Sequence, residues 1–188
     1  MAIKMKSLTV AMLAMAAFAG VSTAHAAASS TVVSGGTVHF TGEVTNAACT
    51  VSPDSADQTV KLGQVRAGSL SSAGAVANQK QFSIDLTDCD TSVSSTASVS
   101  FNGPATAAGD ALAVSSITTA GVAATNVGIQ ILDNMGTVVK PNSDVGSTAF
   151  TLHDGTNSIP LTAQFVSTDG GATAGAADAD ATFNIEYN

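Results

Sequence analysis

The chain has 188 residues and a formal net charge of −8, and only 11% of its residues are charged. This acidic balance argues against nucleic acid or an anionic membrane as a partner. The length is enough for one domain with a well-formed core but not for two domains of ordinary size.

Residues 1–26 have the features of a secretory signal peptide. Two lysines precede an apolar run over residues 8–21, which is too short to span a bilayer. An A-x-A site over residues 24–26 predicts cleavage between Ala26 and Ala27. The remaining 162 residues would carry four basic and fourteen acidic side chains, a net charge of about −10. No second apolar run is long enough for a membrane helix, so we expect an exported product without membrane insertion.

Residues 36–44 form the first strongly patterned segment after the signal. Val38, Phe40 and Val44, with Gly42 between them, fall on one face of an extended chain, and polar side chains fall on the other. This alternation predicts a strand with one buried face. The pattern alone leaves open whether the chain's own domain or another molecule buries that face.

Five later segments alternate in the same way and are separated by turn-rich stretches. They predict β-strands over residues 82–86, 97–101, 127–131, 159–165 and 183–187. Val60 with Leu62, and Phe150 with Leu152, indicate shorter strands. Stretches of small residues at 91–95, 105–111 and 168–177 are expected to be exposed loops. Short strands without a helical stripe are typical of an all-β antiparallel sandwich of immunoglobulin type.

The chain contains two cysteines, Cys49 and Cys89, and both follow the signal. In an exported protein one disulfide between them is the simplest outcome, since only one intrachain pairing exists. On the chain-entropy model this cross-link would contribute about 4 kcal/mol. Two free buried thiols are the alternative.

Candidate catalytic and metal-binding groups are few. His39 and His153 have no further ligand at a metal-site spacing. Two pairs of aspartates stand two residues apart, Asp88 with Asp90 and Asp178 with Asp180. We interpret these as solvated charges, because no histidine or ligand loop accompanies them. With no nucleophile elbow or phosphate loop either, the sequence predicts no catalytic, cofactor-binding or metal site and no cofactor.

The end of the chain adds two further features. Tyr187 is the penultimate residue, and Gly175 is the fourteenth residue from the C-terminus. Together with the signal peptide, the patterned segment near the start and two cysteines forty residues apart, they resemble pilins of the chaperone/usher pathway, specifically the major subunit of type 1 fimbriae. Segments that look like major-pilin sequence are residues 35–40, 46–49, 57–60, 62–64 and 179–183. The resemblance covers the whole chain.

This resemblance implies the pilin fold, an incomplete immunoglobulin-like antiparallel sandwich that a donor strand from a neighbouring subunit completes. It divides the chain into a signal peptide (1–26), an N-terminal donor-strand extension (27–45) and a pilin domain (46–188). The inserting face would be Gly36, Val38, Phe40, Gly42 and Val44. The accepting edge, which also binds the chaperone, would be Gly175, Phe183, Ile185 and Tyr187. Complementation of pilins by chaperones is a known example of strand addition to a sheet edge.

The function that the resemblance implies is structural rather than enzymatic. The chain would polymerise head-to-tail by donor-strand exchange and so build the shaft of a type 1-like fimbria used in adhesion. The implied partners are identical subunits in a helical homopolymer, a periplasmic chaperone, an outer-membrane usher and tip or adaptor pilins. The implied route runs through the periplasm of a Gram-negative bacterium to a fimbrium on the cell surface.

Two alternatives to this function remain open. One is a minor or adaptor subunit of the same fimbria. The other is a secreted monomeric β-sandwich that binds a ligand, in which residues 36–44 complete their own domain.

Overall fold

The computed structural model describes residues 31–42, 44, 46–116 and 121–188. The chain divides into an N-terminal arm, residues 1–43, and a β-domain, residues 44–188, and each is described by itself. The described residues of the arm, 31–42, are exposed and have no regular secondary structure. The predicted signal peptide and its cleavage site lie outside the described residues.

The described part of the β-domain contains nine strands and two short helices. The strands are β1 (Thr50–Val51), β2 (Val76–Cys89), β3 (Thr96–Asn102), β4 (Leu112–Ala113), β5 (Val127–Leu132), β6 (Val138–Val139), β7 (Phe150–Thr151), β8 (Gly155–Ser167) and β9 (Thr182–Tyr187). The helices are α1 (Pro53–Ala56) and the 3-10 helix η1 (Ala67–Leu70). All five long strands predicted from the alternating pattern are present, and the all-β prediction is confirmed.

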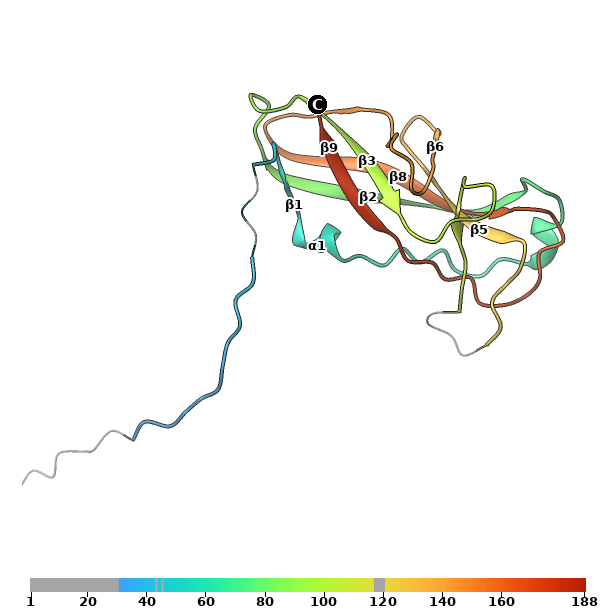
Figure 1. Ribbon diagram of the computed structural model, residues 1–188, viewed down its shortest axis with the longest axis horizontal. Coiled ribbons are helices and arrows are strands. Elements are labelled where there is room, and N and C mark those ends of the chain that lie inside the picture. Colours follow the sequence, from blue (N-terminus) through green and yellow to red (C-terminus); the bar gives the residue numbers. More distant parts are fainter. Residues whose placement is uncertain (1–30, 43, 45, 117–120) are drawn as a thin grey trace, which may run out of the picture. The chain divides into compact units, whose positions relative to one another are not determined.

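The strands form two antiparallel sheets (Figure 1). One sheet has the order β1-β2-β8-β5-β4, with β6 also paired to β5, and the other has the order β7-β3-β9. In the smaller sheet, Val99 of β3 pairs with Ile185 of β9, and Phe101 pairs with Phe183. Within the described residues β9 pairs only with β3, so β9 is an edge strand.

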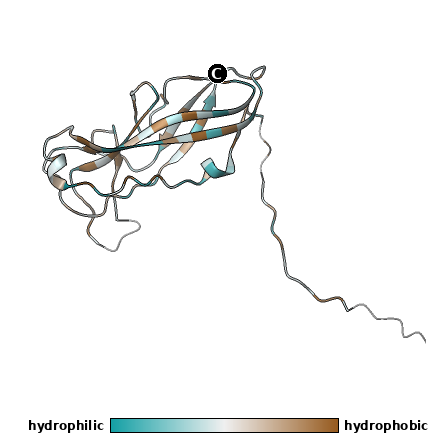
Figure 2. Cartoon of the chain, turned by 180° about the vertical axis from the view of Figure 1, so that it is seen from behind, coloured by the Kyte–Doolittle hydropathy of each residue, from teal (hydrophilic) through white to brown (hydrophobic). Residues whose placement is uncertain are grey.

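Apolar side chains of the two sheets meet in the core between them. Successive side chains of a strand point to opposite faces, so each long strand contributes every second residue. Figure 2 shows the resulting alternation of hydropathy along the long strands. Buried members of the core are Ile84 and Leu86 of β2, Ala97 and Val99 of β3, and Ile159 and Leu161 of β8.

The predicted disulfide between Cys49 and Cys89 is present and buried. It connects the residue before β1 to the last residue of β2. The hydroxyl of Tyr187 donates a hydrogen bond to the backbone oxygen of Cys49, with an O···O distance of 3.2 Å. The last strand is therefore fastened to the same end of the domain as the disulfide.

One connecting segment differs from the prediction. The prediction of a short strand around Val60 and Leu62 is wrong, because this segment has no regular secondary structure. The loop predicted over residues 168–177 is present, and none of its residues is buried. Backbone hydrogen bonds anchor it, among them one from the Gly171 amide to the Ser71 oxygen at 3.0 Å.

Replacing Cys49 and Cys89 together by Ala should lower the free energy of unfolding by about 2–5 kcal/mol, because the unfolded chain would lose its cross-link. Urea unfolding of the oxidised wild type and the double variant measures this difference. As a control, a reducing agent should destabilise the wild type by the same amount and leave the double variant unchanged. Equal stability of the two oxidised proteins would show that the disulfide contributes nothing.

Burial raises the pKa of Tyr187 above its ordinary value of 10.0. Because folding favours the protonated phenol, the associated stability is fully present below the unfolded-state pKa and is lost as the pH rises through the higher folded-state pKa. The chain has one Tyr and no Trp, so tyrosinate absorbance reports this side chain alone. We expect a titration midpoint above that of the urea-unfolded chain. Coincident midpoints would contradict the burial of Tyr187.

Candidate functional site

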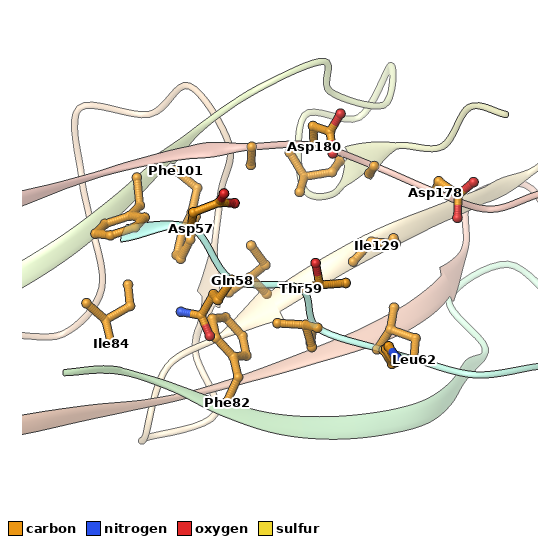
Figure 3. Close-up of a pocket in the computed structure, with 18 of the residues that line it drawn as sticks. Asp57, Gln58, Thr59, Leu62, Phe82, Ile84, Phe101, Ile129, Asp178 and Asp180 are labelled. Atoms are coloured by element: carbon orange, nitrogen blue, oxygen red, sulfur yellow. The ribbon is translucent and has the colours of Figure 1, made fainter. Parts of the chain in front are cut away.

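A groove with a volume of about 730 Å³ lies beside β9, and we call it the β9 groove. One wall is formed by residues 55–63, the segment that contains the end of α1 and continues after it, and the other by residues 177–181 just before β9. Figure 3 shows Phe82, Phe101 and Ile129, from three different strands, among its lining. The apolar floor consists of Phe82, Ile84, Phe101, Ile129, Ile131, Ala163, Phe165 and Phe183.

The floor of the groove is part of the hydrophobic core: five of these eight residues are buried, and the other three are left partly exposed. Phe82, Ile129 and Phe183 pack against the core cluster but are only partly buried. Along β3, the apolar residues Ala97, Val99 and Phe101 are all buried, whereas no residue of the neighbouring β9 is. Since the two strands carry the same alternating pattern, the difference follows from the missing neighbour on one side of β9.

Three of the four residues predicted for the accepting edge lie on one face of β9. Phe183 lines the groove, and its ring centroid is 6.4 Å from that of Phe101. Ile185 and Tyr187 follow at two-residue intervals and pack against the same core cluster. The structure thus brings Phe183, Ile185 and Tyr187 together on the strand that has an open edge.

Gly175, the fourth of these predicted residues, lies outside β9 and outside the groove lining. Its backbone packs closely on the segment around Val122 and Ala124. A Cβ at Gly175 would lie 2.5 Å from the Ala124 nitrogen and from the Val122 oxygen, so the close approach requires glycine. Ala177, two residues further on, is the first residue of the second wall. Gly175 is therefore placed to position the chain that leads into this wall.

Side-chain amides hold the first wall in place. Asn78 sits at a register irregularity of β2 and has a φ of +53°. Its amide nitrogen donates to the backbone oxygens of Leu62 at 3.2 Å and Gln64 at 2.8 Å. The amide of Gln58 donates to the Ser83 oxygen of β2 at 3.1 Å. Asn78 was not predicted as a site residue, because it lies before the strand predicted over residues 82–86. Asparagine tolerates the left-handed conformation that Asn78 adopts at this irregularity.

The predicted inserting face lies in the N-terminal arm and in the residue that follows it. Val38, Phe40 and Val44 are 73%, 91% and 101% exposed. Residues 36–42 form no strand in this single chain, and a Cβ built on Gly42 meets nothing within 4 Å.

The rims of the β9 groove are polar. Asp57 and Lys61 lie on the first wall, and Asp178 and Asp180 lie on the second. Figure 3 shows the three aspartates. Among the described residues no group of three or more His, Cys, Asp or Glu side chains is arranged to hold a metal ion. No described helix is long and apolar enough to cross a membrane. An apolar floor between polar rims suits an extended segment whose side chains alternate between apolar and polar.

Comparison with known sequences assigns the family. The family model described as fimbrial protein matches residues 38–188. The type-1 fimbrial protein A chain of Escherichia coli (strain K12) is 49% identical over 183 residues, covering 97% of this chain and all of that protein. The fimbrial subunit type 1 of Klebsiella pneumoniae is 49% identical over 187 residues, with the same coverage.

Comparison with solved structures agrees with this result. The P pilus rod subunit PapA has a TM-score of 0.63 and 27% identity, covering 76% of this chain and all of that one. A chaperone–usher pilus structure has a TM-score of 0.67 and 29% identity, covering 85% of this chain and all of that one. The fold is thus the incomplete immunoglobulin-like sandwich of pilins. With its whole β-domain matched in sequence and in fold, this chain belongs to the fimbrial protein family.

Proposed function

We propose that the chain is the major structural subunit of a type 1-like fimbria and polymerises by donor-strand exchange. Residues 36–44 of one subunit enter the β9 groove of the next, where they lie beside β9. The observation that carries this proposal is the half-buried apolar face of β9 next to an uncovered groove. The arm of the same chain supplies a matching pattern, with apolar side chains that nothing buries.

The free energy of burial supports the insertion. Val38, Phe40 and Val44 are almost fully exposed in the single chain. Transfer of three such side chains into an apolar groove is worth roughly 5–8 kcal/mol, at about 1.5–3 kcal/mol each, before any backbone hydrogen bond to β9 is counted. Gly36 and Gly42 belong to the same face and fit where the groove leaves no room for a side chain.

The geometry of the contact sets the form of the assembly. Each subunit donates with its extension, residues 27–45, and accepts with its domain, residues 46–188. A contact between two different surfaces that does not close on itself produces a filament. Because release requires a whole inserted strand to leave at once, we expect the filament to be kinetically stable as well.

An uncovered apolar groove is also an aggregation hazard before assembly. We therefore propose that a periplasmic chaperone fills the groove during export, after cleavage between Ala26 and Ala27. An outer-membrane usher would then exchange the chaperone strand for the extension of the next subunit. Tip or adaptor pilins would occupy the far end of the shaft on the cell surface. In this proposal the work of the chain is mechanical and not catalytic.

Deleting residues 27–44 should abolish filament formation and preserve the groove, so the variant should still bind the chaperone. Electron microscopy of cells that express only this variant measures the first effect, and co-purification measures the second. As a positive control, a synthetic peptide of residues 36–44 should raise the thermal midpoint of the variant, because a ligand that binds only the folded state stabilises it. Normal filaments from this variant would contradict the donor assignment.

Replacing Gly42 by Leu should slow polymerisation at least about tenfold, because the added side chain would overpack the shallow part of the groove. Gly35→Leu is the matched control: it lies just outside the inserting face, and a Cβ there likewise meets nothing within 4 Å in the single chain. The rate of filament growth from purified chaperone complexes measures both variants. Equal rates for Gly42→Leu and the wild type would contradict the proposal that Gly42 fits a shallow part of the groove.

A further inference from the structure

We propose that Asp133 and the segment it holds, residues 141–148, determine which edge of the β7-β3-β9 sheet accepts a strand. We call residues 141–148 the edge cover. The sheet has two edges: one is β9, and the other is the side of β3 that faces away from β9. The existence of the edge cover does not depend on the proposed function. The consequence of the edge cover for polymerisation does rest on the proposed function.

The edge of β3 that faces away from β9 needs a cover because its neighbouring strand is very short. β7 pairs only with Thr96 and Ala97, at the beginning of β3. The rest of β3, up to Asn102, would otherwise present open backbone groups to any extended chain. Without further protection the backbone of this edge would also be open to strand addition.

The edge cover satisfies this backbone with two of its own residues. The Ser147 amide donates to the Val99 oxygen at 2.8 Å, and the Val99 amide donates to the Ser147 Oγ at 3.0 Å. The Asn142 amide donates to the Phe101 oxygen at 2.8 Å. The Asn142 side chain accepts from the Gly103 amide at 3.1 Å and donates to the Gly103 oxygen at 2.8 Å. Ser147 and Asn142 thus take the place that the backbone of a neighbouring strand would occupy.

The cover lies directly against the strand. A Cβ at Gly146 would lie 2.9 Å from the Val99 oxygen and 3.1 Å from its carbonyl carbon, so only glycine fits there. Asn142 has a φ of +57°, a conformation that asparagine tolerates better than most residues. An incoming strand could reach Val99 only after the cover had moved away.

Asp133 holds the end of the cover. Its carboxylate is 5% exposed and accepts four hydrogen bonds, from the Met135 amide at 2.9 Å, the Thr137 amide at 2.8 Å, the Thr148 amide at 2.9 Å and the Thr148 hydroxyl at 2.6 Å. Burial raises the pKa of Asp133, but these hydrogen bonds outweigh burial and the pKa lies below its ordinary value. The carboxylate is therefore ionised at neutral pH and fixes Thr148, the neighbour of Ser147, to the turn between β5 and β6.

The result is a sheet with one covered edge and one open edge. Polar side chains cover the β3 edge, while the β9 edge beside the groove stays available. With a single accepting edge on this sheet, each subunit receives one strand there, and the assembly grows along one path. A second open edge would allow branching or sideways association.

Amide hydrogen exchange on the full chain tests the cover. In Asp133→Asn only one of the two terminal side-chain atoms can still accept, so either the hydrogen bonds from Thr148 or those from the Met135 and Thr137 amides are lost. We therefore expect the Val99 and Ser147 amides to exchange at least about tenfold faster. If Asp133→Asn does not fold, Ser147→Ala replaces it as the test variant. Ser147→Ala removes only one hydroxyl and should accelerate exchange at Val99. Asp85→Asn is the matched control, since Asp85 accepts from the hydroxyls of Ser83 and Ser158 on the other sheet. Unchanged exchange at Val99 in both test variants would overturn the proposal.

A binding measurement tests the consequence, with a synthetic peptide of residues 36–44 as the probe. At saturation the wild type and Asp85→Asn should bind one peptide, and Asp133→Asn should bind a second peptide or associate with other copies once its groove is filled. A single bound peptide without association, despite faster exchange at Val99, would also overturn the proposal. Failure of the wild type to bind the peptide would count against the proposed function, and the exchange experiment would still decide whether the cover exists.

Discussion

The strand β9 carries apolar residues at every second position but, within the described residues, has a neighbour on one side only. This one deficiency accounts for the partly buried side chains of Phe183, Ile185 and Tyr187 and for the uncovered floor of the β9 groove. In the proposed function, the exposed apolar face of the arm supplies the strand that the next copy lacks. Burial of that face would then stabilise the assembly.

Polar side chains satisfy backbone groups at two strand edges of the domain where no long neighbouring strand is present. The Asn78 side chain holds the first wall of the groove against β2 without a backbone ladder. The first wall therefore borders the groove but does not pair with β2 as a strand. Asn142 and Ser147 occupy the outer edge of β3. In each place an amide or hydroxyl satisfies a backbone group that would otherwise attract an extended chain. Within the described residues, the β9 edge of the smaller sheet lies beside the apolar groove.

Much of the fold could be predicted from the sequence, because strict alternation reports a strand directly, as it does for β3, β8 and β9. The same pattern could not show that β9 lacks a neighbour, since Phe183, Ile185 and Tyr187 would alternate in a complete sheet as well. The strand predicted around Val60 and Leu62 is absent, and side-chain hydrogen bonds to residues distant in sequence hold this segment in place of a backbone ladder. The roles of Asn78 and Asp133 depend on contacts over 14 to 16 residues, which no local pattern contains.

The central claim is that residues 36–44 complete the domain of a different copy of the chain. A cryo-electron microscopy structure of the assembled filament, at a resolution that shows side chains, tests this claim most directly. The account predicts continuous density from the arm of one subunit into the groove of the next, with Phe40 over the apolar floor and residues 36–44 hydrogen-bonded to β9 of that neighbour. Density that connects residues 36–44 to β9 of their own subunit would contradict it.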